Sequence, residues 1–183
     1  MTSAPEGGAL MSRFRSRLSA VSAIGARCAL AVACAALVSM TAVEAWQVYG
    51  RYVLNESPSW TEPVALLLMS TVAMFGAAVG VRAEAHFGFP LAVHLSPPAV
   101  RRALETLAGL IILAIGATLA GWGGVLLADG WGIRMAGASL PQGLWFLPVC
   151  LGGALITLFA VERLLAIHAP IAEVATAVFS AER

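Results

Sequence analysis

The segment "PVALLLMSTVAMFGAAVGV", residues 63–81, contains nineteen consecutive uncharged positions, most of them apolar. An α-helix of this length extends roughly 28 Å at 1.5 Å per residue, which is close to the thickness of the hydrocarbon layer of a bilayer. The whole chain of 183 residues is 60% hydrophobic and only 11% charged, whereas a soluble domain carries about 25% charged residues. The sequence therefore predicts an all-α integral membrane protein.

Three further windows lack charged residues. Two follow the quoted segment, at residues 106–128 and 135–161, and one precedes it, at residues 28–43. Pro141 and Gly143 indicate that the last helix starts only near Leu144. We therefore expect four transmembrane helices, accompanied by short interfacial helices.

The first window is the shortest, with sixteen residues. Arg27 can extend its side chain to the headgroups and Glu44 can lie near the opposite interface, so the usable span is longer than the window. A signal peptide is the alternative, because "AVEAW" at residues 42–46 loosely offers a small-x-small cleavage pattern. The length of the apolar run and the helical pattern beyond it favour an uncleaved first helix.

Outside the spans the chain divides into a basic N-terminal segment, residues 1–20, and a tail, residues 169–183. We expect residues 1–12 to be disordered and residues 13–20 to form a basic interfacial lead-in to the four-span domain, residues 21–168. The stretch "SPPAVRRALE", residues 96–105, predicts a helix start capped by Ser96. The tail has apolar residues at the spacing of a short amphipathic helix: Ile171, Val174, Ala175 and Val178.

The arginines predict the orientation, because positive charge concentrates on the cytoplasmic face. With four spans, nine of the eleven arginines lie on the side of both termini and only Arg51 and Arg134 lie on the other. The nine are Arg13, Arg15, Arg17, Arg27, Arg82, Arg101, Arg102, Arg163 and Arg183. We expect a multi-pass protein of the bacterial inner membrane with both termini in the cytoplasm.

The sequence offers no catalytic, cofactor or metal site, and its net charge of +1 gives no indication of a nucleic-acid partner. The cysteines Cys28, Cys34 and Cys150 fit no metal or redox spacing and indicate packing within the apolar runs. The histidines, His86, His94 and His168, lie outside the predicted spans. Haem held between facing helices is therefore disfavoured, and we expect no enzyme.

Glu44 is the one acid close to a predicted span, and ionisable residues within a span are functional candidates. Small four-span multidrug exporters use a glutamate in their first helix for protons and cations, so a homodimeric exporter that uses Glu44 is the alternative function. Glu44 lies at the end of its apolar run, however, which favours an interfacial glutamate near Arg51.

Small residues indicate close helix contacts, because membrane helices gain from backbone approach. Gly76 and Gly80 form a G-x-x-x-G pattern in the second span. The third span contains a cluster of small residues, namely Gly116, Ala120, Gly121, Gly123 and Gly124. The spacing does not say whether these faces meet a partner or each other.

The polar connection "RYVLNESPSWTEP", residues 51–63, predicts a corner between two helices at the membrane interface. Pro58 breaks the chain, Ser59 or Thr61 can cap the next helix, and Glu62 complements the N-terminal dipole of that helix. Aromatic residues, which concentrate at the headgroup level, surround the corner: Trp46, Tyr49, Tyr52 and Trp60.

Together these residues resemble the signature region of a known family. The segment "RYVLNESPSWTEPVALLLMSTVAMFGAAVGVRAEAHFGF", residues 51–89, looks like that of the small membrane subunit of TRAP transporters, the DctQ type. The residues that carry the resemblance are Arg51-Tyr52, Asn55, Pro58, Trp60-Thr61-Glu62, Phe75-Gly76-Ala77, Arg82 and His86. Pro63 is a departure, because the family commonly has a second acid there. A third possibility is the small subunit of the tricarboxylate tripartite system, which is also four-span but lacks the Trp-Thr-Glu and histidine pattern seen here.

The resemblance implies an accessory subunit of a sodium-coupled uptake system for an organic acid. In that family a large membrane subunit carries the substrate and ion sites, and a periplasmic binding protein delivers the substrate. The small subunit would scaffold the large one and help dock the binding protein. Glu56 and Arg134 are the candidate docking residues, while Arg51 and Glu62 can be docking residues or structural ones. Gly76, Gly80 and the small residues of the third span are candidates for helix contact.

Overall fold

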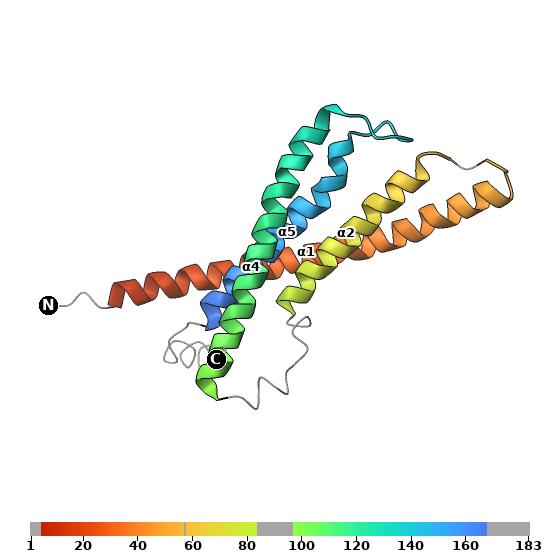
Figure 1. Ribbon diagram of the computed structural model, residues 1–183. Coiled ribbons are helices and arrows are strands. Elements are labelled where there is room, and N and C mark those ends of the chain that lie inside the picture. Colours follow the sequence, from red (N-terminus) through yellow and green to blue (C-terminus); the bar gives the residue numbers. More distant parts are fainter. Residues whose placement is uncertain (1–4, 57, 84–96, 168–183) are drawn as a thin grey trace.

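The computed structural model describes residues 5–56, 58–83 and 97–167, and the side chains from residue 15 onward (Figure 1). This part of the chain forms four long helices, α1 (Pro5–Tyr52), α2 (Thr61–Arg82), α4 (Pro98–Asp129) and α5 (Leu147–Ile167). Two short 3₁₀ helices, η1 (Gly130–Gly132) and η2 (Gln142–Phe146), lie between α4 and α5. All four long helices are long and apolar enough to cross a membrane, which confirms the predicted fold class.

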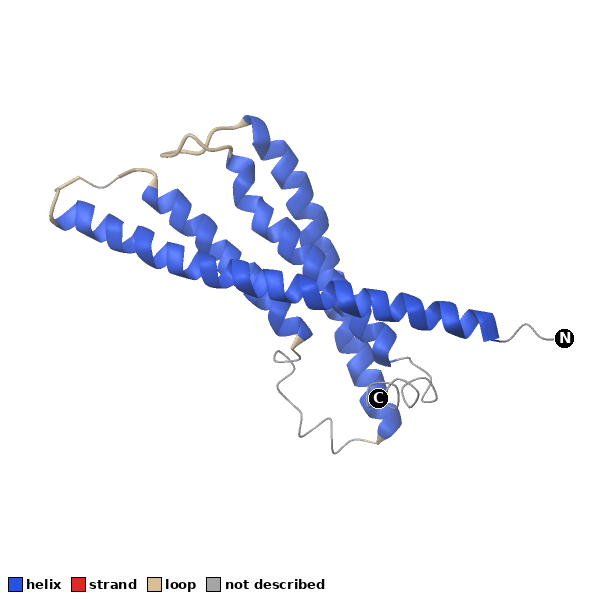
Figure 2. Cartoon of the chain, turned by 180° about the vertical axis from the view of Figure 1, so that it is seen from behind, coloured by secondary structure: helices blue, strands red, loops and turns tan. Residues whose placement is uncertain are grey.

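The helices form two antiparallel hairpins, α1 with α2 and α4 with α5 (Figures 1 and 2). Packing of α2 against α5 joins the hairpins, so these two helices are central and α1 and α4 are peripheral. The main apolar cluster lies where α1, α2 and α5 meet and contains Ala26, Ala78, Val81, Ile156 and Phe159. Each outer helix therefore presents much of its surface to lipid or to another protein.

One face of α1 packs on α2 along a row with alternating spacings of four and three residues. At one end of the row the side chains are small, and all of them are buried: Ser22, Ala26, Ala29, Ala33 and Ala36. It continues through Met40, Val43 and Gln47, which are half-buried, to the buried Gly50. This spacing is the heptad pattern of two helices that pack side by side, and the alanines let the two backbones approach closely.

A row of glycines joins α4 to α5. Gly109, Gly116, Gly123 and Gly130 recur every seven residues and are all buried. A Cβ on Gly116 would lie 2.9 Å from the backbone nitrogen of Thr157, and one on Gly123 would lie 2.9 Å from that of Cys150. The backbones of α4 and α5 are therefore in direct contact at Gly116 and Gly123, in the middle of this row, which is named the glycine seam.

The N-terminal part of α1 differs from the sequence prediction. Helix α1 begins at Pro5, whereas the sequence predicts disorder through residue 12 and only an interfacial lead-in before residue 21. Helix formation is cooperative, so the long apolar helix extends readily through the Ala, Leu, Met and Arg residues that precede it. This part of α1 projects beyond the bundle (Figures 1 and 2). The predicted amphipathic tail, residues 169–183, lies outside the described residues.

The predicted helix starts need small corrections. At α2 the N-cap position is Trp60, and no side chain caps the helix, so the capping roles predicted for Ser59 and Thr61 are wrong. Helix α4 begins at Pro98 with Pro97 at the N-cap, one residue later than the predicted cap Ser96, which lies outside the described residues. The last span enters through η2 and becomes α-helical at Leu147 rather than at Leu144. Prolines set both later starts, because they fit the first turn of a helix.

Candidate interaction surfaces

The corner between α1 and α2 has a defined backbone. The Val53 amide donates to the Tyr49 carbonyl at 2.9 Å, and the Glu56 amide donates to the Gly50 carbonyl at 3.0 Å. Asn55 adopts the left-handed conformation, with φ of 53°. A Cβ on Gly50 would lie 2.8 Å from the Glu56 carbonyl oxygen. Gly50 and Asn55 together therefore allow the chain to reverse within a few residues.

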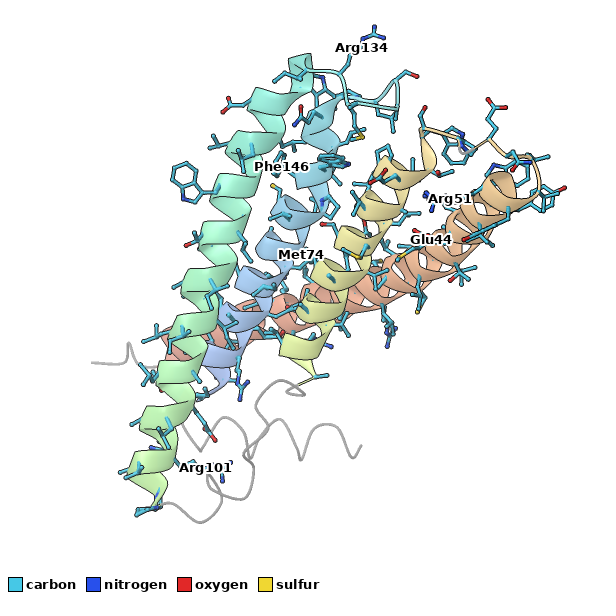
Figure 3. All side chains as sticks on the ribbon, turned by 45° about the vertical axis from the view of Figure 1, so that its right-hand side comes forward. Glu44, Arg51, Met74, Arg101, Arg134 and Phe146 are labelled. Atoms are coloured by element: carbon cyan, nitrogen blue, oxygen red, sulfur yellow. The ribbon has the colours of Figure 1, made fainter. Side chains whose placement is uncertain are left out.

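The connection between α4 and α5 is also ordered by backbone hydrogen bonds. The Met135 amide donates to the Leu140 carbonyl at 2.8 Å, and the Gln142 amide donates to the Ile133 carbonyl at 2.8 Å. These bonds surround an isolated antiparallel bridge between Arg134 and Pro141. Met135 is only 4% exposed and anchors this small hairpin, from which Arg134 projects away from the bundle (Figure 3).

The two corners contact each other. The Ser59 hydroxyl donates to the Gly137 carbonyl at 3.1 Å, and Gly137 has a φ of 83°. Close by, the Trp145 indole donates to the Pro63 carbonyl at 3.3 Å. The exposed residues of the two corners, 51–60 and 131–140, therefore share one surface, which is named the corner face.

The corner face brings together charged residues from distant parts of the sequence. Arg51, Glu56 and Arg134 are all exposed there, and Glu62 is exposed in the adjoining first turn of α2. The aromatic Tyr52 and Trp60 are 76% and 44% exposed. Sequence reasoning assigned no role to Asp129, which is exposed at the end of α4 beside this face. The sequence could have indicated this, because Asp129 directly follows the uncharged window at residues 106–128 and so lies at the end of a predicted span.

An ion pair joins α2 and α5 at the opposite end of the bundle. The Arg82 Nε lies 3.7 Å from the Glu162 Oε2, and the two side chains are 32% and 22% exposed. Arg82 was predicted from the family resemblance, but Glu162 was not. Both residues directly follow uncharged windows, yet the sequence does not reveal that α2 packs on α5. A local charged pair, between Arg101 and Glu105 at 2.8 Å within α4, also lies at this end.

Glu44 lies on the outer surface of α1 and is exposed. It lines a shallow apolar groove on this helix together with Leu37, Met40, Thr41, Ala45, Val48, Tyr49, Tyr52 and Val53. Trp46 and Tyr49 stand beside each other, with ring centroids 5.9 Å apart. Among the ion pairs of the described residues, none connects Glu44 to Arg51, so the predicted proximity of these two residues is not an ion pair.

The predicted small-residue faces divide into two groups. Gly116 and Gly123 lie in the glycine seam and Ala120 is half-buried beside it, whereas Gly121 is exposed and a Cβ there would meet nothing within 4 Å. Gly124 is half-buried, and a Cβ there would lie 3.7 Å from the Cys150 sulfur. On α2, Gly76 is exposed with nothing within 4 Å of its Cβ position, and Gly80 is half-buried. A contact of Gly76 and Gly80 with another subunit stays a prediction.

The interior between the two ends is apolar. Of the residues that the structure describes, the buried polar ones are Ser22 and Thr61, and no ionisable residue is buried. The described residues contain no group of side chains that could hold a metal ion, and His86, His94 and His168 lie outside them. Cys28 and Cys34 are exposed on α1 rather than buried as predicted, because the buried row of α1 passes through Ala29 and Ala33.

Comparison with known protein families gives a match over most of the chain. The family model of the DctQ component of tripartite ATP-independent periplasmic transporters matches residues 40–168. The match covers the end of α1, both corners and the whole of α2, α4 and α5. No curated protein sequence matches the chain.

Proposed function

Because the chain belongs to the DctQ family and is thus the small subunit of a tripartite ATP-independent periplasmic (TRAP) transporter, we propose that it acts as an accessory subunit. It packs beside a large membrane subunit, which it scaffolds, and it helps a periplasmic binding protein to dock. The complete system takes up an organic acid together with sodium ions. The chain itself carries out no transport chemistry and no enzymatic reaction.

The distribution of polar groups carries this proposal. In the described part of the bundle, charged side chains lie at the two ends and on outer surfaces, and the residues buried between them are almost all apolar. A transport site within a membrane usually needs ionisable or polar groups in its interior. The arrangement found here suits a helix bundle that supports another subunit.

The corner face suits the docking of a binding protein. Glu56 and Arg134 are exposed on backbone segments that hydrogen bonds hold in place, and charges on a preformed surface steer a charged partner. The excess of arginines at the opposite end predicts that the corner face points to the periplasm, with both termini in the cytoplasm. Reporter fusions at the two termini, and a cysteine introduced at the exposed Ser139, would test this orientation by their accessibility in whole cells.

Reconstitution tests the proposed function directly. The chain and the large membrane subunit of the same system should co-purify from detergent, and vesicles that contain both should take up the organic acid when the binding protein and a sodium gradient are present. Vesicles with either subunit alone should not. Uptake by this chain alone would overturn the proposal.

The alternative of a homodimeric exporter is not supported. Its basis in the sequence was Glu44 as a proton site within the first span, but the family match assigns the chain to a tripartite transporter. Glu44 also lies on the outer surface of α1, at the level of the first turn of α2 and not in the interior of the bundle.

A further inference from the structure

Helix α1 presents a second row of residues that no other described helix covers. Leu37, Thr41, Glu44, Val48 and Tyr52 follow each other at spacings of three or four residues, and all five are exposed. They form the floor of the shallow groove on α1. All the residues that line this groove belong to α1, except Val53, which directly follows the helix. This spacing is the one that lets a second helix pack alongside.

The groove runs from the apolar window of α1 to the end of this helix at the corner. From Leu37 to Val53 it extends along roughly 24 Å of helix, at 1.5 Å per residue, so it faces the hydrocarbon layer up to Glu44 and the interface beyond it. Its walls are aliphatic and aromatic, since Leu37, Val48 and Tyr49 are each about half exposed. The end of a transmembrane helix fits this surface in length and polarity.

Glu44 gives the groove its chemical specificity. The Thr41 hydroxyl already donates to the Leu37 carbonyl at 3.0 Å. The hydroxyls of Tyr49 and Tyr52 and the Glu44 carboxylate have no partner among the described residues, and Glu44 is the charged residue of the groove. Because α1 and α2 are antiparallel, with Ala33 near Phe75 and Gly50 near Glu56, Glu44 lies level with the first turn of α2. At the edge of the hydrocarbon layer and among apolar side chains, a carboxylate gains from a positively charged neighbour. A basic residue on the neighbouring helix would complement it.

A second copy of this chain does not suit the groove. In a two-fold symmetric pair the same patch meets itself, so the two Glu44 carboxylates would face each other across an apolar contact. The repulsion of like charges disfavours this arrangement. The groove on α4, lined by Ala117, Thr118, Gly121, Trp122 and Val125, is uncharged and suits lipid chains equally well.

We propose that the α1 groove is the docking site for a transmembrane helix of the large membrane subunit, and that this helix carries an arginine or lysine, near its end at the corner face, that pairs with Glu44. This inference rests on the proposed function, because it identifies the surface through which the accessory subunit holds its partner. It separates two contacts, since the α1 groove binds the membrane subunit and the corner face binds the soluble protein.

Site-specific photo-crosslinking tests the location. The chain is co-expressed with the large subunit, each with its own affinity tag, and a photoreactive phenylalanine analogue replaces Thr41 or Val48 in the groove. In the matched control it replaces Trp122, which is 66% exposed on α4. We expect an adduct that carries both tags from the two groove positions and little from the control. An adduct of two copies of this chain, an adduct with lipid alone, or equal yields from groove and control would overturn the proposal.

Charge reversal tests the ion pair. Glu44→Arg should lower the amount of co-purified large subunit by about tenfold or more, because it places like charges together in the contact, and Glu44→Gln should lower it less. Glu56→Arg, on the corner face, is the control and should leave co-purification unchanged. If the Glu44→Arg variant co-purifies as much large subunit as the wild type does, the inference is wrong and the proposed function still stands. Failure of the wild-type chain to co-purify would instead contradict the proposed function itself.

Discussion

The Ser59 hydroxyl donates a hydrogen bond of 3.1 Å to the Gly137 carbonyl and so joins two corners that lie 78 positions apart in the chain. Gly137 is suited to this contact by its backbone. Its φ is 83°, and a Cβ there would lie 2.5 Å from the Ser59 carbonyl oxygen. The relative position of Glu56 and Arg134, one on each corner, depends on this contact.

Replacement of Gly137 should therefore loosen the corner face. We expect Gly137→Ala to lower the free energy of unfolding by about 1–3 kcal/mol, because it combines a strained backbone with a steric clash. The melting temperature in detergent, followed by tryptophan fluorescence, measures the effect. Gly132→Ala is the matched control, since nothing lies within 4 Å of its Cβ position. Equal shifts for the two variants would show that the contact does not matter.

The glycine seam should be sensitive to side-chain size on one face of α4 only. Gly123→Val places a side chain against the backbone of Cys150, because even the Cβ would lie 2.9 Å from the Cys150 nitrogen. Overpacking of this kind lowers the free energy of unfolding by about 1–3 kcal/mol. Gly121→Val, two residues earlier, points to open space and should have little effect. Unfolding titrations with dodecyl sulfate compare the two, and a larger loss for Gly121→Val would contradict the seam.

The hydrogen bond from Trp145 to the Pro63 carbonyl, 3.3 Å long, connects η2 to the start of α2. Trp145→Phe keeps an aromatic ring and removes the donor, so we expect a loss of roughly 0.5–1.5 kcal/mol in the free energy of unfolding. Trp131→Phe is the control, because Trp131 is 58% exposed. The same titration serves, and an unchanged midpoint for Trp145→Phe would mean that the bond contributes no net stability.

The Arg82–Glu162 ion pair should contribute little to stability. The charged atoms lie 3.7 Å apart, and the Arg82 side chain is about one-third exposed, at 32%, so solvent screens the attraction. A double-mutant cycle with Arg82→Gln and Glu162→Gln should give a coupling energy below about 1 kcal/mol. The coupling should weaken further at high salt. A coupling above about 2 kcal/mol would indicate a pair that is effectively buried.

The sequence predicted the fold class because the bilayer imposes a simple requirement. Each span must be long and uncharged, and the windows at residues 63–81, 106–128 and 135–161 lie within α2, α4 and the η2–α5 span with its preceding connection. The first and last residues of α1 could not be predicted in the same way, because charged residues end an apolar window without ending a helix. Ser59 and Thr61 were predicted as caps, but their hydroxyls make other hydrogen bonds. The Ser59 hydroxyl donates to the Gly137 carbonyl, and the Thr61 hydroxyl donates to the Pro58 carbonyl at 2.8 Å.

The contacts between helices could be predicted only in part. The seven-residue spacing of Gly109, Gly116, Gly123 and Gly130 is visible in the sequence, but Gly121 and Gly124 lie among them and only the packed structure separates the two sets. The Arg82–Glu162 pair needs the knowledge that α2 packs on α5, which is a property of the whole bundle. Arg51, Glu56 and Arg134 were predicted to lie at one end, and the described structure places them on one surface.

Helix α1 runs without a break over 48 residues, from beyond the bundle at one end to the corner at the other. Such a helix bends little, because each turn is fixed by its own hydrogen bonds. A tilt or rotation of α1 near Glu44 therefore also moves Arg15 and Arg17, which lie on the far side of the apolar layer. One continuous helix thus couples the two sides of the membrane.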